Sequence, residues 1–192
     1  RTNYESRFRY VDIKNLIVII TAESLKSSDK VYRLNLINSI TGFKPGNLIG
    51  TKSVNNQSNL AIFSSVVHLG SKPPLLGIIT RPNSVPRHTY KNIIDTNYFT
   101  INHISKNSVL RAHYTSAKFD VDDSEFKRCG FEEDYINSFY APFVKESEVK
   151  IGMKLVEEIN IRSNNTILLV GEVIKIIVDD NFIGKDGSLK YE

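Results

Sequence analysis

The sequence of 192 residues has no tryptophan, one methionine and one cysteine, Cys129. A single cysteine cannot form a disulfide within the chain, and this favours a reducing compartment. The four histidines do not pair at the spacing of helical metal ligands, so we expect no metal site. The sequence also lacks the glycine-rich loops that cradle nucleotide phosphates and the G-x-S-x-G elbow of hydrolases. If a nucleotide binds, other groups must hold it.

Long hydrophobic runs are also missing. The longest uncharged apolar run near the start, Leu16 to Ile20, is too short to span a bilayer. Arginines precede this run as in a signal peptide, but charged residues crowd it and no small-residue cleavage site follows. We therefore expect a cytoplasmic protein with no membrane partner. The segment Leu16–Thr21 is either a strand or part of an extension of the domain.

Basic and acidic residues are both present, and the basic residues are not concentrated in one segment. The net charge of +4 permits an anionic ligand, but the scattered basic residues do not indicate a nucleic-acid partner. The acidic group Asp120, Asp122, Asp123 and Glu125 lacks the glycine and spacing of a calcium loop, and we interpret it as a solvated turn and helix start. The chain begins without methionine and ends on Lys190-Tyr191-Glu192, so a fragment truncated at its C-terminus is one alternative.

Strand-like segments dominate a chain whose length suits one domain. Alternation and β-branched residues predict strands at Asn59–Val67, Leu75–Thr80, Tyr98–Ile104, Met153–Ile161 and Thr166–Val178. The short apolar stretch Asn47–Thr51 precedes a hairpin loop, Lys52–Ser58. Helices are predicted over 29–39 with Ser28 as N-cap, and at Thr89–Thr96, Ser124–Cys129 and Glu132–Phe139. We therefore predict a mainly β fold, an antiparallel barrel with peripheral helices, over residues 29–192, after an N-terminal extension of residues 1–28.

Polar residues interrupt the predicted strand Asn59–Val67. On a straight strand Asn59, Phe63 and Ser65 share one face, while Leu60 and Ser64 share the other. Small hydroxyls among large aliphatic residues would let a planar ligand lie close to the backbone. The pattern alone favours the alternative, core serines whose hydrogen bonds are satisfied internally.

A second cluster of polar residues joins the end of one strand to the start of a helix. Arg81, Arg87, His88 and Thr89 lie within ten residues, and the predicted helix begins among them. Guanidinium groups match phosphate oxygens, and a helix N-terminus adds backbone donors with a favourable dipole. The cluster is either a phosphate anchor or a solvated basic loop.

The motifs resemble a known family when they are taken in order. The series NLIGT, NLAIFSS, PPL, RP, RHTYKNI, FTIN, AHYTSAKF, SEF, CGF and VGEV is similar to the flavin reductase-like family of FMN-binding split barrels. The similarity runs from about Tyr32 to Val178. It implies a six-stranded antiparallel Greek-key split barrel that forms a homodimer, with FMN at the barrel edge near the subunit interface.

The resemblance also implies the FMN-binding residues. Asn59–Ser65 would run along the isoalloxazine ring, Arg87-His88-Thr89 would lie near the phosphate, and Ser116 would approach from the dimer contact. The candidates for cofactor binding are Asn47, Thr51, Asn59, Leu60, Ala61, Phe63, Ser64, Ser65, Arg81, Arg87, His88, Thr89 and Ser116. His88 replaces the usual acidic residue of the family's motif, which makes the site more positive.

One departure from the family pattern concerns activity. Reductases of the family that use a nicotinamide donor often have a Gly-Asp-His run before the strand matching Leu168–Val173, and the histidine aligns with Thr166. The first hypothesis is an FMN-dependent flavin reductase that takes hydride from NADH or NADPH and serves a partner oxygenase or another acceptor. It needs no catalytic side chain, since the flavin carries the chemistry. The alternative is a non-catalytic FMN-binding carrier or sensor; a basic nucleic-acid-binding barrel ranks third.

Overall fold

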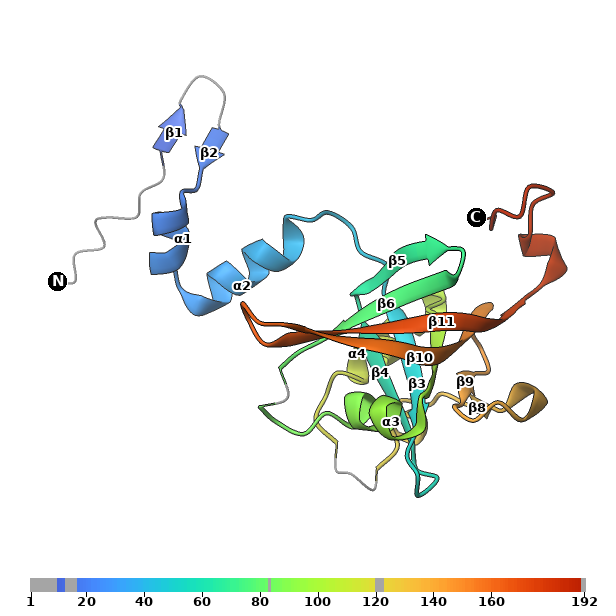
Figure 1. The fold of residues 1–192 in the computed structure, drawn as a ribbon. Coiled ribbons are helices and arrows are strands. Elements are labelled where there is room, and N and C mark those ends of the chain that lie inside the picture. Colours follow the sequence, from blue (N-terminus) through green and yellow to red (C-terminus); the bar gives the residue numbers. More distant parts are fainter. Residues whose placement is uncertain (1–9, 13–16, 83, 120–122, 191–192) are drawn as a thin grey trace. The chain divides into compact units, whose positions relative to one another are not determined.

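The computed structural model describes residues 10–12, 17–82, 84–119 and 123–190, and the chain forms two compact units, residues 1–44 and 45–192 (Figure 1). None of the helices in these described stretches has both the length and the apolar character needed to cross a membrane.

The first unit contains a small hairpin and two helices. Strands β1 (Tyr10–Asp12) and β2 (Ile17–Ile19) pair antiparallel, and α1 (Ala22–Ser27) and α2 (Lys30–Ser39) follow. Of the segment expected at Leu16–Thr21, residues 17–19 form β2, and Leu16 lies outside the described residues.

Asp29, not Ser28, caps helix α2. Its carboxylate accepts from the backbone N–H groups of Val31 at 2.8 Å and Tyr32 at 3.2 Å. The predicted cap Ser28 instead donates its hydroxyl to the Leu25 carbonyl at 2.7 Å and closes α1. The prediction was wrong by one residue because either side chain can cap a helix, and only the backbone decides which one reaches the free amides.

The second unit is built on a seven-stranded antiparallel sheet in the order β4-β3-β7-β10-β11-β6-β5. Its strands are β3 (Asn47–Lys52), β4 (Ser58–Phe63), β5 (Val66–Ser71), β6 (Pro74–Thr80), β7 (Tyr98–His103), β10 (Val149–Ile161) and β11 (Thr166–Val178). The two edge strands, β4 and β5, are consecutive in the chain and joined only by Ser64 and Ser65. The sheet must therefore curl, and Phe63 and Val66, on opposite sides of this link, pack against the same core. The predicted mainly β, antiparallel barrel is confirmed.

The number of strands differs from the six expected because the predicted strand Asn59–Val67 is divided. The chain bends at Ser64 and Ser65, and the hydroxyl of Ser65 donates to the Ile79 carbonyl at 2.9 Å and accepts from the Ile79 N–H at 3.3 Å. A side chain thus takes the place of a backbone pairing between β5 and β6. Residues before the bend pair with β3 and residues after it pair with β6.

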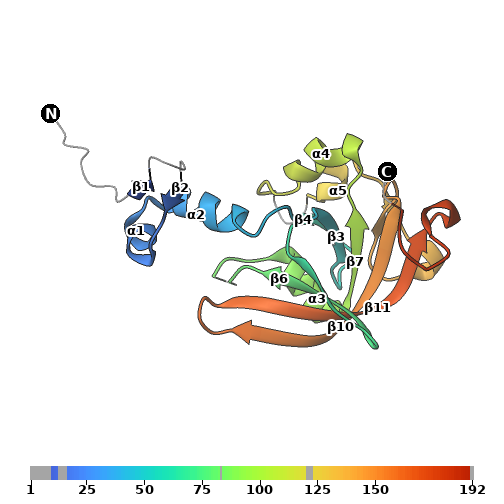
Figure 2. The same cartoon turned by 90° about the horizontal axis from the view of Figure 1, so that it is seen from above.

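Two apolar clusters lie on opposite faces of the sheet. The first fills the barrel and contains Ile49, Ile78, Ile93, Phe99, Ile101, Met153, Ile167 and Leu169. The second lies between the strands β3 and β4 and the helices α4 (Val109–Tyr114) and α5 (Glu125–Arg128). Helix α3 (His88–Thr96) contributes Ile93 to the first cluster and contacts both β3 and β4 (Figure 2). Each fully buried aliphatic side chain stabilises the fold by about 1.5–3 kcal/mol.

The segment after α5 is not the helix predicted at Glu132–Phe139. It forms the short strand β8 (Glu133–Asp134), the 3₁₀ turn η2 (Ile136–Ser138) and the strand β9 (Phe143–Val144), which pairs with β8. Asn137 and Ser138 have φ values of 51° and 56°, which an α-helix does not permit. Phe139, the last residue of the predicted helix, instead lies in a small buried cluster with Ala141 and Phe143. Two further turns, η1 (Lys106–Ser108) and η3 (Asp180–Phe182), complete the described elements.

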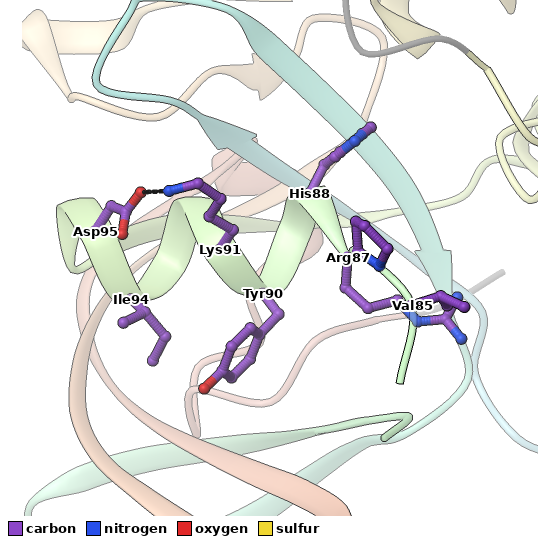
Figure 3. A pocket seen from close by; sticks show the side chains of 8 residues that line it. Val85, Arg87, His88, Tyr90, Lys91, Ile94 and Asp95 are labelled. Carbon is purple, nitrogen blue, oxygen red and sulfur yellow. Dashed lines mark hydrogen bonds and ion pairs between the residues drawn. The ribbon is translucent and has the colours of Figure 1, made fainter. Parts of the chain in front are cut away.

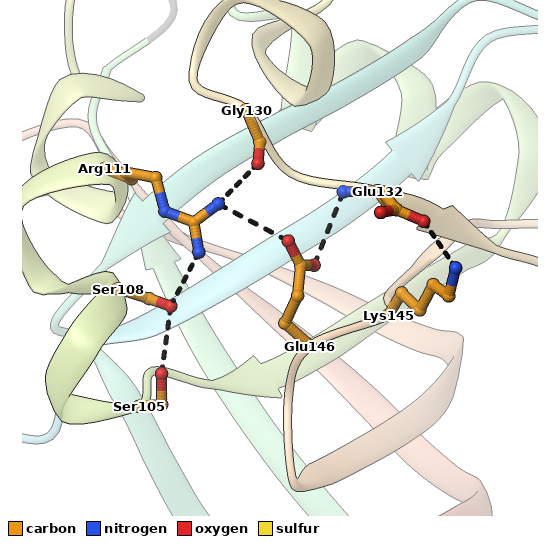
Figure 4. Close-up of polar contacts among 7 residues, drawn as sticks. All are labelled: Ser105, Ser108, Arg111, Gly130, Glu132, Lys145 and Glu146. Carbon is orange, nitrogen blue, oxygen red and sulfur yellow. Dashed lines mark hydrogen bonds and ion pairs between the residues drawn. The ribbon is translucent and has the colours of Figure 1, made fainter.

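A network around Arg111 fixes α4 and the loop after α5 (Figure 4). The Arg111 guanidinium donates to the Gly130 carbonyl, to Ser108 Oγ at 3.1 Å and to Glu146 Oε1 at 3.4 Å. The other carboxylate oxygen of Glu146 accepts from the Glu132 N–H at 3.4 Å. These contacts hold the loop that follows α5 in place, and α5 in turn packs on the edge strand β4.

Candidate functional site

A buried polar network joins α3 to the strands β3 and β4. The Asn59 amide donates to Thr89 Oγ1 at 3.0 Å and to Thr51 Oγ1 at 3.4 Å, and Asn92 Nδ2 donates to Thr51 Oγ1 at 3.1 Å. All four side chains are buried, and Thr51 is fully so. The network therefore fixes the first turns of α3 relative to the hairpin of β3 and β4. Three of its members were candidates from the sequence; Asn92 was missed, because a lone asparagine inside a helix has no local signature.

The N-terminus of α3 is open to an anion. Its N-cap, Arg87, makes no side-chain capping bond, so the first-turn amides have no cap from that residue. The Nε atom of Arg87 is buried and has no hydrogen-bond partner within the described structure. A buried guanidinium donor without a partner is unfavourable, and a phosphate or carboxylate oxygen would satisfy it. The nine-residue helix adds its dipole to the same end.

His88 and Arg81 lie on either side of this end of α3 in the sequence. His88 is half-buried at the first helical position, and Arg81 is exposed just after β6. Thr89 follows His88 and belongs to the buried network. The structure thus brings Arg87, His88 and Thr89 to the start of one helix, whereas Arg81 is on a separate exposed segment.

The free edge of β4 is partly occupied by a carboxyl group. Glu125 Oε2 accepts from the Leu60 N–H at 3.1 Å, and Glu125 is only 9% exposed. Burial raises the pKa of the Glu125 carboxyl, while the Leu60 N–H, its own N–H and the charge of His88 act in the opposite direction. Glu125 is a helix start, as interpreted, but it is buried, so the interpretation that it is solvated was wrong; of the same group, Asp120 and Asp122 lie outside the described residues. Its hydrogen-bonding partner lies 65 residues away in the chain, so no local pattern shows it.

The remaining candidates on β3 and β4 have ordinary structural contacts. The side chain of Leu60 is fully buried in the second apolar cluster, and Ala61 and Phe63 are half-buried. Phe63 packs against the barrel core. Asn47 lies at the other end of β3 from Thr51 and donates to the Pro45 carbonyl at 3.3 Å.

The candidate hydroxyl residues are dispersed. Ser64 is exposed at the bend, and Ser65 bonds to the backbone of β6 as described above. Ser116 follows α4 and donates to the His113 carbonyl at 2.7 Å. Among the described contacts, none joins these three serines to the start of α3. Their role toward a ligand remains a prediction.

A cavity of about 290 Å³ lies along α3 (Figure 3). It is lined by Val85, Pro86, Arg87, His88, Tyr90, Lys91, Ile94 and Asp95. Thr89 and Asn92, the two helical members of the network, do not line the cavity, so the cavity and the network use different residues of the helix. The volume is at the small end of the roughly 300–1,000 Å³ range of sites that enclose a drug-sized ligand. We therefore place the ring of a large planar ligand along β4 and not in this cavity.

The start of α3 and the edge of β4 together suit a planar molecule with a phosphate end. The phosphate would meet Arg87 Nε, which has no partner within the described structure, and the start of α3, where Arg87 provides no side-chain cap. Along β4, alternate residues direct their N–H groups to the same side, so Ile62 points its N–H to the free edge as Leu60 does. The Leu60 N–H already donates to Glu125, which leaves the Ile62 end of the strand for a polar ring edge.

Comparisons with known proteins identify the family and the fold. The family model of the flavin reductase like domain matches residues 43–190. A crystal structure from Shewanella frigidimarina, described as a flavin reductase with a split barrel domain, is 44% identical, with a TM-score of 0.86, and the match covers 90% of this chain and 85% of that chain. Nitrilotriacetate monooxygenase component B from Bacillus cereus has the same fold, with 19% identity, a TM-score of 0.79, and 91% and 87% coverage. An uncharacterised protein of Aquifex aeolicus is 26% identical over 166 residues, which are 85% of this chain and 83% of that protein.

Proposed function

The chain belongs to the family of flavin reductase like domains, and from that premise we propose that it is an FMN-dependent oxidoreductase that uses NADH or NADPH as donor. The observation that carries the proposal is the buried, unpartnered Nε of Arg87 beside the uncapped N-terminus of α3. An anion would satisfy both features, and a phosphate fits both.

Different residues would bind the two ends of the cofactor. Arg87, with the α3 amides, would hold the phosphate, and His88 would add positive charge when protonated. The Thr51–Asn59–Thr89–Asn92 network would keep this anchor at a fixed position relative to β4. The free edge of β4 near Ile62 and Phe63 would orient the ring. FMN, when bound, would supply the capacity to accept hydride from the nicotinamide donor.

We further propose a homodimer that passes electrons to a partner oxygenase in the cytoplasm. The resemblance places Ser116 near a dimer contact, and α4, just before it, exposes Val109, Leu110 and Tyr114 at 54%, 76% and 65%. A second copy covering this helix would bury these side chains. Similarity to a monooxygenase component supports an oxygenase as acceptor. The absence of a disulfide at Cys129 supports a reducing compartment.

The alternative is an FMN-binding carrier or sensor without turnover. Thr166, which stands where many reductases of the family have histidine, begins β11, and its hydroxyl donates to Asn164 Oδ1 at 2.7 Å. A threonine held in a turn offers neither a titratable group nor a cation to a nicotinamide donor. This observation favours the alternative and makes donor oxidation the deciding assay.

The first experiment is the visible spectrum of the purified protein with FMN, recorded anaerobically before and after addition of NADH and of NADPH. Bleaching of the flavin bands by one donor would support the reductase and identify the donor. Persistent bands would favour the carrier or sensor.

The binding site is tested in the same way with variants. Arg87→Ala should lose FMN, whereas Arg162→Ala, in the exposed turn between β10 and β11, should keep it. Equal FMN binding by both variants would contradict the proposed phosphate anchor.

A further inference from the structure

Glu125 lies at the junction of three elements. It is the first residue of α5, its carboxyl accepts from the Leu60 N–H of β4, and it is close enough to His88 of α3 for their charges to interact. Its other titratable neighbour is Cys129 of α5, whose thiol pKa is raised by burial and by the Glu125 charge. On the β4 side the described contact is the Leu60 amide. Glu125 therefore contacts the proposed ring strand directly and interacts through its charge with the proposed phosphate anchor.

The hydrogen bond gives Glu125 a mechanical role. A sheet edge has unpaired backbone donors, and α5 has only four residues with which to hold that edge. The Glu125–Leu60 bond is reinforced by one between Ser58 Oγ and Ser124 Oγ at 2.8 Å. These two bonds set where β4 runs relative to α5, and hence where its free Ile62 end lies.

The charge gives Glu125 a second role. A carboxylate beside His88 competes with a phosphate for the same positive group, and it repels the phosphate through a poorly solvated interior. A neutral carboxyl keeps the hydrogen bond to Leu60 without this repulsion. Because burial raises the pKa of the Glu125 carboxyl, the neutral form extends to higher pH than it would for an exposed glutamate.

We propose that Glu125 is a positioning residue of the flavin site, which fixes the edge of β4 for the ring and whose ionisation opposes binding of the flavin phosphate near His88. This inference rests on the proposed function. It assigns the site a proton linkage: FMN binding and a protonated Glu125 favour each other.

The experiment compares FMN dissociation constants of wild type, Glu125→Gln and Glu125→Ala, measured by quenching of flavin fluorescence from about pH 5 to about pH 8. Glutamine keeps an acceptor for the Leu60 N–H and removes the charge; alanine removes both. The matched control is Glu133→Gln, because Glu133 is an exposed carboxylate that also bonds to β4, through Ser58. The phosphate titrates in all four proteins, so the ratio of each variant to wild type removes its contribution.

We expect Glu125→Gln to match wild type at about pH 5 and to bind FMN roughly threefold to tenfold more tightly at about pH 8. Glu125→Ala should bind more weakly than Glu125→Gln at every pH, and Glu133→Gln should follow wild type. A ratio of Glu125→Gln to wild type that stays at one across the pH range would overturn the inference while leaving the proposed function intact. Failure of wild type to bind FMN at any pH would overturn both.

Discussion

Replacing Thr51 by valine tests whether the buried polar network holds α3 in place. Valine has nearly the shape of threonine, so the change removes one hydroxyl oxygen and little volume. That oxygen accepts from Asn92 Nδ2 at 3.1 Å and from Asn59 Nδ2 at 3.4 Å. The Asn92 amide would lose a buried acceptor, which costs about 1–3 kcal/mol. Asn59 keeps its bond to Thr89 at 3.0 Å, and its bond to Thr51 is long, so its contribution is small.

The free energy of unfolding should therefore fall by about 2 kcal/mol in Thr51→Val. For a chain of this size that lowers the melting temperature by roughly 4–8 °C. Urea unfolding without FMN measures the loss directly, and a flavin titration should show weaker binding because the start of α3 is less well fixed. Thr51→Ser restores the hydroxyl and should recover most of the FMN affinity.

Two results would refute this reasoning. Unfolding of Thr51→Val within about 0.5 kcal/mol of wild type, the range of ordinary surface substitutions, would mean that the network does not stabilise α3. Equal losses of FMN affinity in Thr51→Val and Thr51→Ser would mean that shape, and not the hydroxyl, matters at this position.

Three further predictions use other parts of the structure. Arg87→Ala should weaken FMN binding by about 1.5–3 kcal/mol through loss of a charge-assisted contact, measured by titration calorimetry; unchanged affinity would place the phosphate elsewhere. Gly171→Ala should destabilise the barrel by about 1–3 kcal/mol, because a methyl group there would lie 2.7 Å from Phe99 Cζ and 3.0 Å from Met153 Cε, and a melting curve like that of wild type would show that the core can adjust. Since burial raises the pKa of the Glu125 carboxyl, its contribution to folding is present below the unfolded pKa and is lost as the pH rises through the folded value. The free energy of unfolding of Glu125→Gln should therefore increase relative to that of wild type between about pH 5 and about pH 8. Stability profiles that run parallel over this range would contradict the prediction.

The strands could be predicted because their signal is local. Alternating and β-branched residues marked β6, β7, β10 and β11 to within a few residues, and the helix at α3 likewise. The family resemblance, spread over many short motifs, led to the split barrel that the comparisons confirm. The prediction that Asn59–Val67 forms one continuous strand was wrong. Ser64 and Ser65 lie between apolar neighbours and therefore look like residues of one strand. Nothing local shows that the Ser65 hydroxyl bonds to Ile79.

The site was only partly predictable for a similar reason. Thr51, Asn59 and Thr89 were found through motifs and do lie together. Asn92 and Glu125 were missed because their roles depend on partners 41 and 65 residues away. A glutamate beside aspartates suggests a solvated turn, and only the packing of α5 against β4 makes it a buried acid.

The two-residue link between the edge strands has a consequence for how the protein folds. Closing a barrel normally joins strands that are distant in the chain, which is slow because the intervening loop must be ordered first. Here the edges that meet are β4 and β5, separated by Ser64 and Ser65 alone, so closure is a local step. The long-range steps are the pairings β3–β7, β6–β11 and β7–β10. Folding should therefore be limited by these long-range pairings and not by closure at the link between β4 and β5.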